Sequence, residues 1–227
     1  GMKKFFVIFL AFIALFSIGC GNTNTADNEN AHVASTILDL SRPIKPPAEF
    51  AGKQILVAFF SHTGENFEVG IIEKGNTHII AEQIAELTKA DKIFEIQTVT
   101  PYPADYQEMT KVAKDEQTTQ ARPEIAARVE DMDAYDIIFL GYPIWYHDLP
   151  MPVYTFLESH DFTGKTIIPF CTGSGSAMSG MEEEIPHFAR GAQMRQGFGI
   201  QGKIAQYHQE QAKNAVVNGL ASLGYTN

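Results

Sequence analysis

Short apolar runs alternate with helical patterns from Lys53 to the end of the chain. The intervening segments carry apolar residues at helical spacing, as Ile80, Ile84 and Leu87 do. The apolar runs predict five strands, at residues 54–61, 92–99, 136–142, 166–172 and 193–200. This alternation is typical of a parallel sheet with helices on both faces. The pattern therefore predicts an α/β fold of the doubly wound type, a three-layer sandwich, over residues 53–227.

The segments between the predicted strands differ in how well they fit a helix. Pro123 breaks the segment 102–133 or begins a second helix within it, and Pro186 disturbs the segment 176–190. The last helix ends at Gly224, a typical capping residue. Its apolar stripe consists of Ala212, Val216, Leu220 and Leu223. We expect about five helices.

The N-terminal residues have the pattern of a secretion signal. Lys3 and Lys4 precede an apolar run over 5–16 that is short for a membrane span. Ser17-Ile18-Gly19-Cys20 resembles the lipobox of bacterial lipoproteins, although Ser17 stands where an aliphatic residue is commoner. Gly1 precedes Met2, so we expect it to be an added residue, and we expect the rest of 1–19 to be a signal peptide. We also expect a lipid on Cys20 that anchors the protein outside the cytoplasmic membrane, at the cell surface or in the periplasm. The alternative is an anchor that is never cleaved.

Residues 20–52 separate this signal from the predicted domain. They are rich in Asn, Thr, Ala and Pro, with Pro43, Pro46 and Pro47 close together. A segment of this composition buries little apolar area, so we expect a flexible tether.

The chain is acidic, with a formal net charge of −10. Cleavage of residues 1–19 removes two of the 17 basic residues and leaves 27 acidic ones, so the formal charge becomes −12. Such a surface disfavours nucleic acid and anionic lipid, which leaves the lipid on Cys20 as the only membrane contact. Cys171 is then the one remaining thiol, so we expect no intramolecular disulfide and no cysteine-based metal site.

The first of three unusual loops follows the strand 54–61. In doubly wound folds, ligands bind beyond the carboxyl ends of the strands. Hydroxyl and backbone N–H groups at a helix N-terminus can bind phosphate there without Lys or Arg. The candidate residues are Ser61, His62, Thr63 and Gly64, with Asn76 and Thr77 at the start of the first helix. The alternative is that Ser61, Asn76 and Thr77 are ordinary turn and capping residues.

The other two loops suit a flat ligand. The second contains Pro143, Ile144, Trp145 and Tyr146, and Trp145 is the only tryptophan of the chain. The third is Thr172-Gly173-Ser174-Gly175-Ser176, whose glycines permit close approach of the backbone to a polar ring edge. Ordinary aromatic packing and a flexible Gly/Ser turn are the alternatives. The three loops together predict a site for a mononucleotide with a flat heterocycle.

With these motifs, residues 53–225 resemble the flavodoxin-like family. The resemblance implies the strand order 2-1-3-4-5 and non-covalently bound FMN. By position, the loop from Ser61 to Gly64 would hold the phosphate together with Asn76 and Thr77. Pro143, Ile144, Trp145 and Tyr146 would flank the isoalloxazine ring, and Thr172 to Ser176 would contact its pyrimidine edge.

Two features depart from the family pattern. Residues 65–75 are extra between the phosphate loop and its helix, and this segment either covers the site or contacts a partner. An alternative register places Glu65-Asn66-Phe67 in the loop, but the helical stripe begins only after Thr77. The third loop lacks the aromatic residue that many small electron-carrying flavodoxins place over the outer ring face. We expect that face to be open unless Tyr102, Tyr146 or the extra segment covers it.

An open ring face favours an FMN-dependent reductase that passes electrons from a reduced donor to a quinone or similar acceptor. A covered ring favours the alternative, a flavodoxin-type electron carrier between proteins. The donor and acceptor would be a quinone, NAD(P)H or another redox protein, although NAD(P)H is not expected outside the cytoplasmic membrane. His147 would donate a proton beside the ring, or be a solvated loop residue. The resemblance also allows a homodimer, because a neighbouring subunit often completes an open flavin face.

Two other classes of function fit less well. Ser174 and Ser176 could suggest a serine hydrolase, but no Gly-x-Ser-x-Gly elbow surrounds them. A flavin-free surface-binding lipoprotein would require the extra segment to block the site.

Overall fold

A parallel sheet forms the centre of the residues that the computed structural model describes, 38–175 and 177–227. It consists of β1 (Ile55–Phe59), β4 (Lys92–Glu95), β5 (Ile137–Pro143), β6 (Thr166–Gly173), β7 (Gln193–Met194) and β8 (Phe198–Gln201). The order is β4-β1-β5-β6, and both β7 and β8 pair with β6. This confirms the predicted order 2-1-3-4-5, with the fifth predicted strand split into two short pieces.

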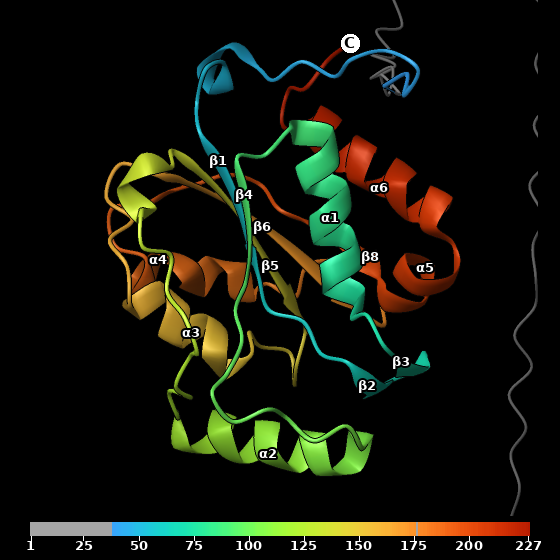
Figure 1. Cartoon of the computed structure of the whole chain (residues 1–227), viewed down its shortest axis with the longest axis vertical. Helices are drawn as coiled ribbons and strands as arrows, with labels where there is room; N and C mark the ends of the chain where they lie inside the picture. Colours follow the sequence, from blue (N-terminus) through green and yellow to red (C-terminus); the bar gives the residue numbers. More distant parts are fainter. Residues whose placement is uncertain (1–37, 176) are drawn as a thin grey trace, which may run out of the picture. The chain divides into compact units, whose positions relative to one another are not determined.

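Helices cover both faces of the sheet (Figure 1). On one face lie α1 (Asn76–Thr88), α5 (Gly202–Tyr207) and α6 (Gln209–Ser222), and on the other lie α3 (Met151–Glu158) and α4 (Ile185–Phe188). Three short 3-10 helices complete the described residues: Ala48–Phe50, Met132–Ala134 and Met181–Glu184. The three-layer α/β architecture is therefore confirmed.

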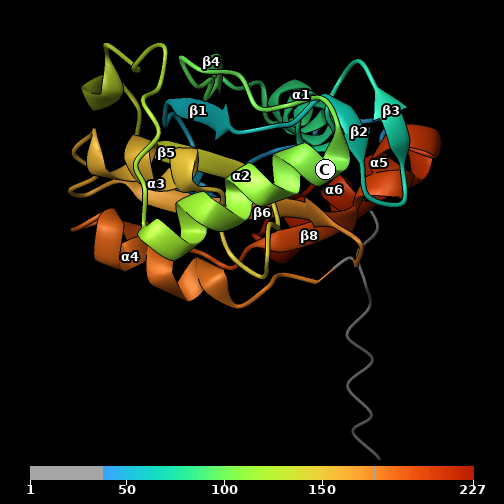
Figure 2. The ribbon, with the colours of Figure 1, turned by 90° about the horizontal axis from the view of Figure 1, so that it is seen from below.

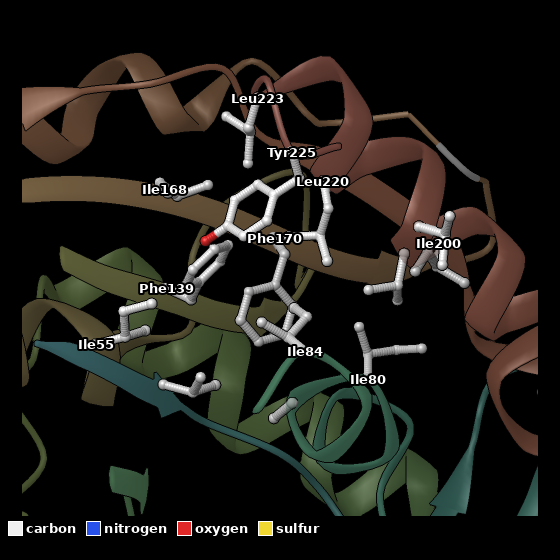
Figure 3. Close-up of a cluster of buried hydrophobic side chains, with 14 of the residues drawn as sticks. Ile55, Ile80, Ile84, Phe139, Ile168, Phe170, Ile200, Leu220, Leu223 and Tyr225 are labelled. Atoms are coloured by element: carbon white, nitrogen blue, oxygen red, sulfur yellow. The ribbon is translucent and has the colours of Figure 1, made fainter. Parts of the chain in front are cut away.

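The central strands are buried on both sides, so successive residues enter two different cores. Val57 and Phe59 pack with α1 and α6, whereas Leu56 and Ala58 pack with α3. Figure 3 shows the first core, in which Phe139 and Phe170 from β5 and β6 meet side chains of α1 and α6. Continuous apolar strands are the expected consequence of burial on both faces.

Helix α2 (Tyr106–Thr119) covers neither face of the sheet. It lies across the carboxyl ends of the strands, beside a hairpin of β2 (Gly64–Asn66) and β3 (Gly70–Ile72), as Figure 2 shows. Asp105 accepts a hydrogen bond from the N–H of Glu108 (2.9 Å) and caps the helix, which buries only Met109 and Ala113. Because only two residues of this helix are buried, its sequence is mostly polar.

Several helix predictions differ from the structure. Pro123 begins no helix: α2 ends at Thr119, its capping residue Gln120 has the left-handed conformation (φ 52°), and a loop follows. Within the described part of 176–190, only a 3-10 turn and the four-residue α4 are helical. The last predicted helix is α6, which Gly224 follows with φ +93°, and the short helix α5 that precedes it was not predicted.

The residues before β1 differ from the expected tether, of which the structure describes 38–52. Leu38 and Phe50 are buried in the core that α6 covers, and Lys45 forms an antiparallel bridge with Thr226. A few apolar anchors within a polar segment are enough for this packing, so the domain begins earlier than Lys53. The predicted signal peptide and Cys20 lie outside the described residues.

No helix among the described residues is both long and apolar enough to span a membrane. Cys171 is buried at the end of β6, where its Sγ lies 3.4 Å from the Sδ of Met178. Burial raises the pKa of this thiol to about 12.

Candidate functional site

A cleft lies at the carboxyl edge of the sheet and encloses about 780 Å³ of space continuous with solvent. One wall, which we name the sheet-edge wall, follows β5 and β6. The opposite wall, the outer wall, belongs to the hairpin and α2. The sheet-edge wall consists of Pro143, Ile144, Trp145, Tyr146, Thr172, Gly173 and Ser174. The outer wall consists of Asn66, Phe67, Tyr106, Met109, Thr110 and Ala113.

The N-terminus of α1 closes one end of the cleft. Its N-cap residue is Gly75, which has no side chain that could accept from the first N–H groups of the helix. Asn76 lines the cleft, and its Oδ1 atom is buried without a hydrogen-bond partner. Gly202 lies against this amide, since a Cβ there would come within 2.6 Å of the Asn76 Nδ2. This end of the cleft therefore offers backbone N–H groups and an unpaired amide oxygen.

Thr77 lies just behind Asn76 and does not line the cleft. Its hydroxyl is buried and forms a 2.7 Å hydrogen bond with the hydroxyl of Thr172. The bond joins the start of α1 to the end of β6, so it fixes the helix N-terminus against the third loop.

The first predicted loop faces a different hollow, which shares no lining residue with the cleft. Ser61, His62 and Thr63 line it, together with Lys74 and His78. The Ser61 hydroxyl accepts a hydrogen bond from the N–H of His78 (3.1 Å), so it satisfies one of the free amides of α1. Among the described residues, the structure brings Asn76 to the cleft but not these three.

His62 is buried, and its ring packs against Trp145 of the second loop. Its Nε2 donates to the carbonyl of Pro103 (3.0 Å), and its Nδ1 accepts from the amide of Asn66 (3.4 Å). Burial lowers the pKa of the imidazole, so the neutral ring is favoured. Both ring nitrogens are thus occupied within the protein.

Gly64 forms the joint between the first loop and the hairpin. Its φ is +90°, and a Cβ would lie 2.7 Å from the carbonyl oxygen of Ala104. Only glycine combines that backbone conformation with so close an approach. The residue therefore places the hairpin beside the N-terminus of α2.

The second loop turns back within two residues. Trp145 and Asp148 exchange both backbone hydrogen bonds (3.0 and 2.9 Å), while Tyr146 and His147 have φ of 50° and 62°. Positive φ at both central positions is typical of a type I′ turn, which normally prefers Gly or Asn. Tyr146 lines the cleft, whereas His147 is exposed and lies outside its lining.

Three rings hold the Trp145 indole edge-on. The ring centroids of Tyr102, Phe60 and His62 lie 5.0, 5.2 and 6.0 Å from that of Trp145. The Tyr102 hydroxyl in turn donates to the carboxylate of Glu116 (2.6 Å), and burial raises the pKa of both groups. The indole is therefore fixed in place by its neighbours.

The third loop is divided between the cleft and solvent. The register of the sheet places Pro143 opposite Thr172, so the second and third loops begin side by side. Thr172, Gly173 and Ser174 line the cleft, and Gly175 is exposed outside it. Ser176 lies outside the described residues.

Asn66 and Phe67 belong to the extra segment 65–75, for which covering the site was one of two expectations, whereas the residues of α2 and Gly202 were not expected in the site. Two signals were available: the extra segment 65–75, and the polar helix that follows Asp105. Neither shows from its pattern alone that it lies against the cleft.

The lining of the cleft is uncharged, since no Lys, Arg, Asp or Glu occurs among the described lining residues. The described part of the chain also holds no group of three or more His, Cys, Asp or Glu side chains placed to bind a metal ion. The polar atoms of the cleft are thus amides and hydroxyls, which bind a phosphate through dipoles and hydrogen bonds.

The chain is similar to a known family and to several solved structures. The family model Flavodoxin matches residues 54–216. A protein from Bacteroides uniformis, described provisionally as a flavoprotein, is 30% identical and superposes with a TM-score of 0.58. The alignment covers 73% of this chain and 98% of that protein. A similarly described protein from Bacteroides eggerthii is 26% identical, with a TM-score of 0.55 over 70% of this chain and 98% of its own.

A flavoprotein from Lactobacillus acidophilus, solved in complex with FMN, shares the fold. It is 20% identical with a TM-score of 0.52, and the alignment covers 69% of this chain and 97% of that protein. None of the curated proteins compared matches the chain. The match of the family model to most of the folded residues shows that the chain belongs to the flavodoxin family.

Proposed function

We propose that this protein binds FMN in the cleft and passes electrons through it. The observation that carries the proposal is the joining of the N-terminus of α1, with the unpaired amide oxygen of Asn76, and a fixed aromatic wall in one uncharged cleft. The flavoprotein from Lactobacillus acidophilus, which was solved with FMN, supports the same cofactor.

The residues of the cleft fit FMN at both ends. The N–H groups at the start of α1 suit the phosphate, and the unpaired Oδ1 of Asn76 needs a donor such as a ribityl hydroxyl group. Trp145 and Tyr146 offer aromatic rings beside the isoalloxazine, and the backbone from Thr172 to Ser174 would reach its polar edge. When bound, FMN supplies the hydride and one-electron chemistry, while the protein sets its orientation and access.

The outer wall favours an electron carrier. The expectation of an open ring face depended on the extra segment not covering it. Phe67 of that segment and Met109 of α2 instead lie across the cleft from the sheet-edge wall. A ring held between two walls exchanges electrons at its exposed edge, as a carrier between proteins does.

A reductase is the second candidate. The cleft is continuous with solvent and lined by uncharged residues, which suits a flat neutral acceptor such as a quinone. In this role a reduced quinone, NAD(P)H or another redox protein would supply the electrons, and His147 at the turn would assist proton transfer to the substrate. If the protein is a reductase, we expect a homodimer in which a neighbouring subunit completes the flavin site.

The location of the protein is part of the proposal. If Cys20 carries a lipid outside the cytoplasmic membrane, a quinone or an exported redox protein is the available donor. Mass spectrometry of the membrane-extracted protein tests this, since diacylglyceryl on Cys20 is expected and an unmodified N-terminal segment would contradict it.

The first experiment asks whether FMN binds. The purified full chain should be yellow, absorb at about 450 nm and release FMN on denaturation. A colourless protein that also fails to quench the fluorescence of added FMN would refute the proposal.

The second experiment separates the two roles. We expect the FMN-loaded protein to oxidise NAD(P)H and reduced quinone negligibly but to exchange electrons rapidly with a redox protein, as a carrier does. Rapid turnover with either small donor, lowered in His147→Ala without loss of FMN, would establish the reductase instead.

A further inference from the structure

The hairpin β2–β3 is attached to the N-terminus of α2 by several contacts. The N–H of Glu65 donates to the carbonyl of Ala104 (2.7 Å), and the Glu65 carboxylate accepts from the N–H of Tyr106 (3.1 Å). A carboxylate at this position also pairs favourably with the positive end of the helix dipole. On its other side the hairpin carbonyl of Val69 accepts a hydrogen bond from the Tyr207 hydroxyl of α5.

The side chain of Phe67 completes this attachment. Its ring is stacked on that of Tyr106, with centroids 6.0 Å apart and an angle of 29° between the planes. Both residues line the cleft, although Phe67 remains 59% exposed. An aromatic residue with this exposure in a short hairpin contributes little to a core. The ring of Phe67 instead packs on that of Tyr106 and lines the cleft.

Helix α2 is also bonded to the second loop, through Thr110 one turn from Tyr106 and through Gln117 near its C-terminus. The Tyr146 hydroxyl donates to the carbonyl of Thr110 (3.0 Å), and Gln117 donates to the Asp148 carboxylate (3.3 Å). Helix α2 is therefore bonded to the second loop along its length, and at its N-terminus it is bonded to the hairpin as well. The Phe67 and Tyr106 rings stand where the two parts of the outer wall meet.

We propose that the stacked rings of Phe67 and Tyr106 close the hairpin end of the cleft and slow the release of bound FMN. This inference rests on the proposed function. The extra segment then has a defined role: it brings an aromatic side chain to the outer wall. Phe67 and Tyr106 are positioning residues, since the electron chemistry belongs to the cofactor.

The test measures the rate of FMN release. FMN-loaded full chain is mixed with an excess of an apo-flavoprotein that traps free FMN, and the recovery or loss of flavin signal is followed with time. Phe67→Ala should release FMN about three to ten times faster than wild type, the factor expected for the loss of one aromatic pair. The association rate should change less than the dissociation rate.

Three further variants make the test specific. Ile71→Ala truncates another apolar side chain of the hairpin, which is 85% exposed, and should leave the release rate unchanged. Phe67→Tyr keeps the ring and should restore slow release, whereas Phe67→Leu should not. In a double-mutant cycle with Tyr106→Leu, the effects of the two changes on the release rate should be markedly less than additive.

The outcomes distinguish this inference from the proposed function. Release from Phe67→Ala at the wild-type rate, or equal acceleration in Ile71→Ala, would overturn the role of the ring pair while FMN binding stands. Failure of wild type to bind FMN would overturn both. Unfolding in urea should have the same midpoint in Phe67→Ala and wild type, and a large drop would assign the effect to general loss of structure.

Discussion

The two walls of the cleft are built in different ways. The sheet-edge wall continues from β5 and β6, whose residues from Ile137 to Tyr142 and from Ile167 to Thr172 are almost all buried between two cores. The outer wall consists of residues from α2 and from a hairpin whose two strands have three residues each. Helix α2 buries only Met109 and Ala113. The first wall is held by the whole domain, and the second by a few named contacts.

This difference separates two properties of a binding site. Segments with few buried contacts open at a lower free energy than the core strands do. If the cleft binds FMN, the sheet-edge wall should therefore supply the larger part of the affinity. The outer wall should act mainly through the rate of release, with a correspondingly smaller effect on affinity. Substitutions in the two walls should have effects of different size and kind.

The largest effect should come from Trp145→Ala in the sheet-edge wall. Loss of a fixed stacking face should weaken FMN binding about tenfold to a hundredfold, measured by quenching of FMN fluorescence. Trp145→Phe retains an aromatic ring and should lose less affinity. Full affinity in Trp145→Ala would assign this indole to packing with Phe60 and Tyr102 alone.

A second substitution tests how the sheet-edge wall is joined to the start of α1. Thr172→Val leaves the Thr77 hydroxyl buried without a partner and should lower the free energy of unfolding by about 1–3 kcal/mol. Urea denaturation measures this change. Replacing both threonines by valine should restore part of the stability, because no buried hydroxyl is then unpaired. A double variant as unstable as the sum of the single ones would contradict this account.

The smallest expected effect concerns His62, which packs against Trp145 of the second loop. Burial lowers the pKa of His62 in the folded protein below its ordinary 6.5, so the unfolded chain takes up the proton first as the pH falls. This contribution to stability is present above pH 6.5 and is lost as the pH falls through the folded pKa. Wild type should therefore lose stability more steeply than His62→Gln below pH 6.5, by urea denaturation at several pH values. Parallel pH profiles would show that His62 does not contribute.

The parts that sequence patterns predicted are those that the core determines. Strands such as 136–142 are apolar because both of their faces are buried, and the order of the sheet follows from the family that these motifs resemble. The loops at Trp145 and Thr172 were placed at one edge because parallel strands share their carboxyl ends.

The sequence offered the hairpin half of the outer wall as one of two alternatives, since the segment 65–75 was expected either to cover the site or to contact a partner. The α2 half could not be predicted, because its contacts with the hairpin are between segments of little periodicity. The Phe67 and Tyr106 rings are 39 residues apart in the sequence, and neither belongs to an apolar stripe. Ser61 and His62 show the opposite case. Their residue types suit a phosphate loop, yet Ser61 accepts from an amide of α1 and His62 bonds to Pro103 and Asn66.

Burial of Cys171 has a practical consequence for observing the outer wall in solution. In the described part of the chain it is the one free thiol, and its Sγ is shielded beside Met178. Thiolate is the reactive form, so a thiol with a pKa of about 12 reacts slowly with labelling reagents near neutral pH. In protein whose Cys20 is lipidated or replaced by serine, a cysteine introduced at the exposed Ile71 can thus carry a fluorophore or a spin label while Cys171 stays unlabelled. The distance from such a label on the hairpin to the flavin would report the position of the outer wall directly.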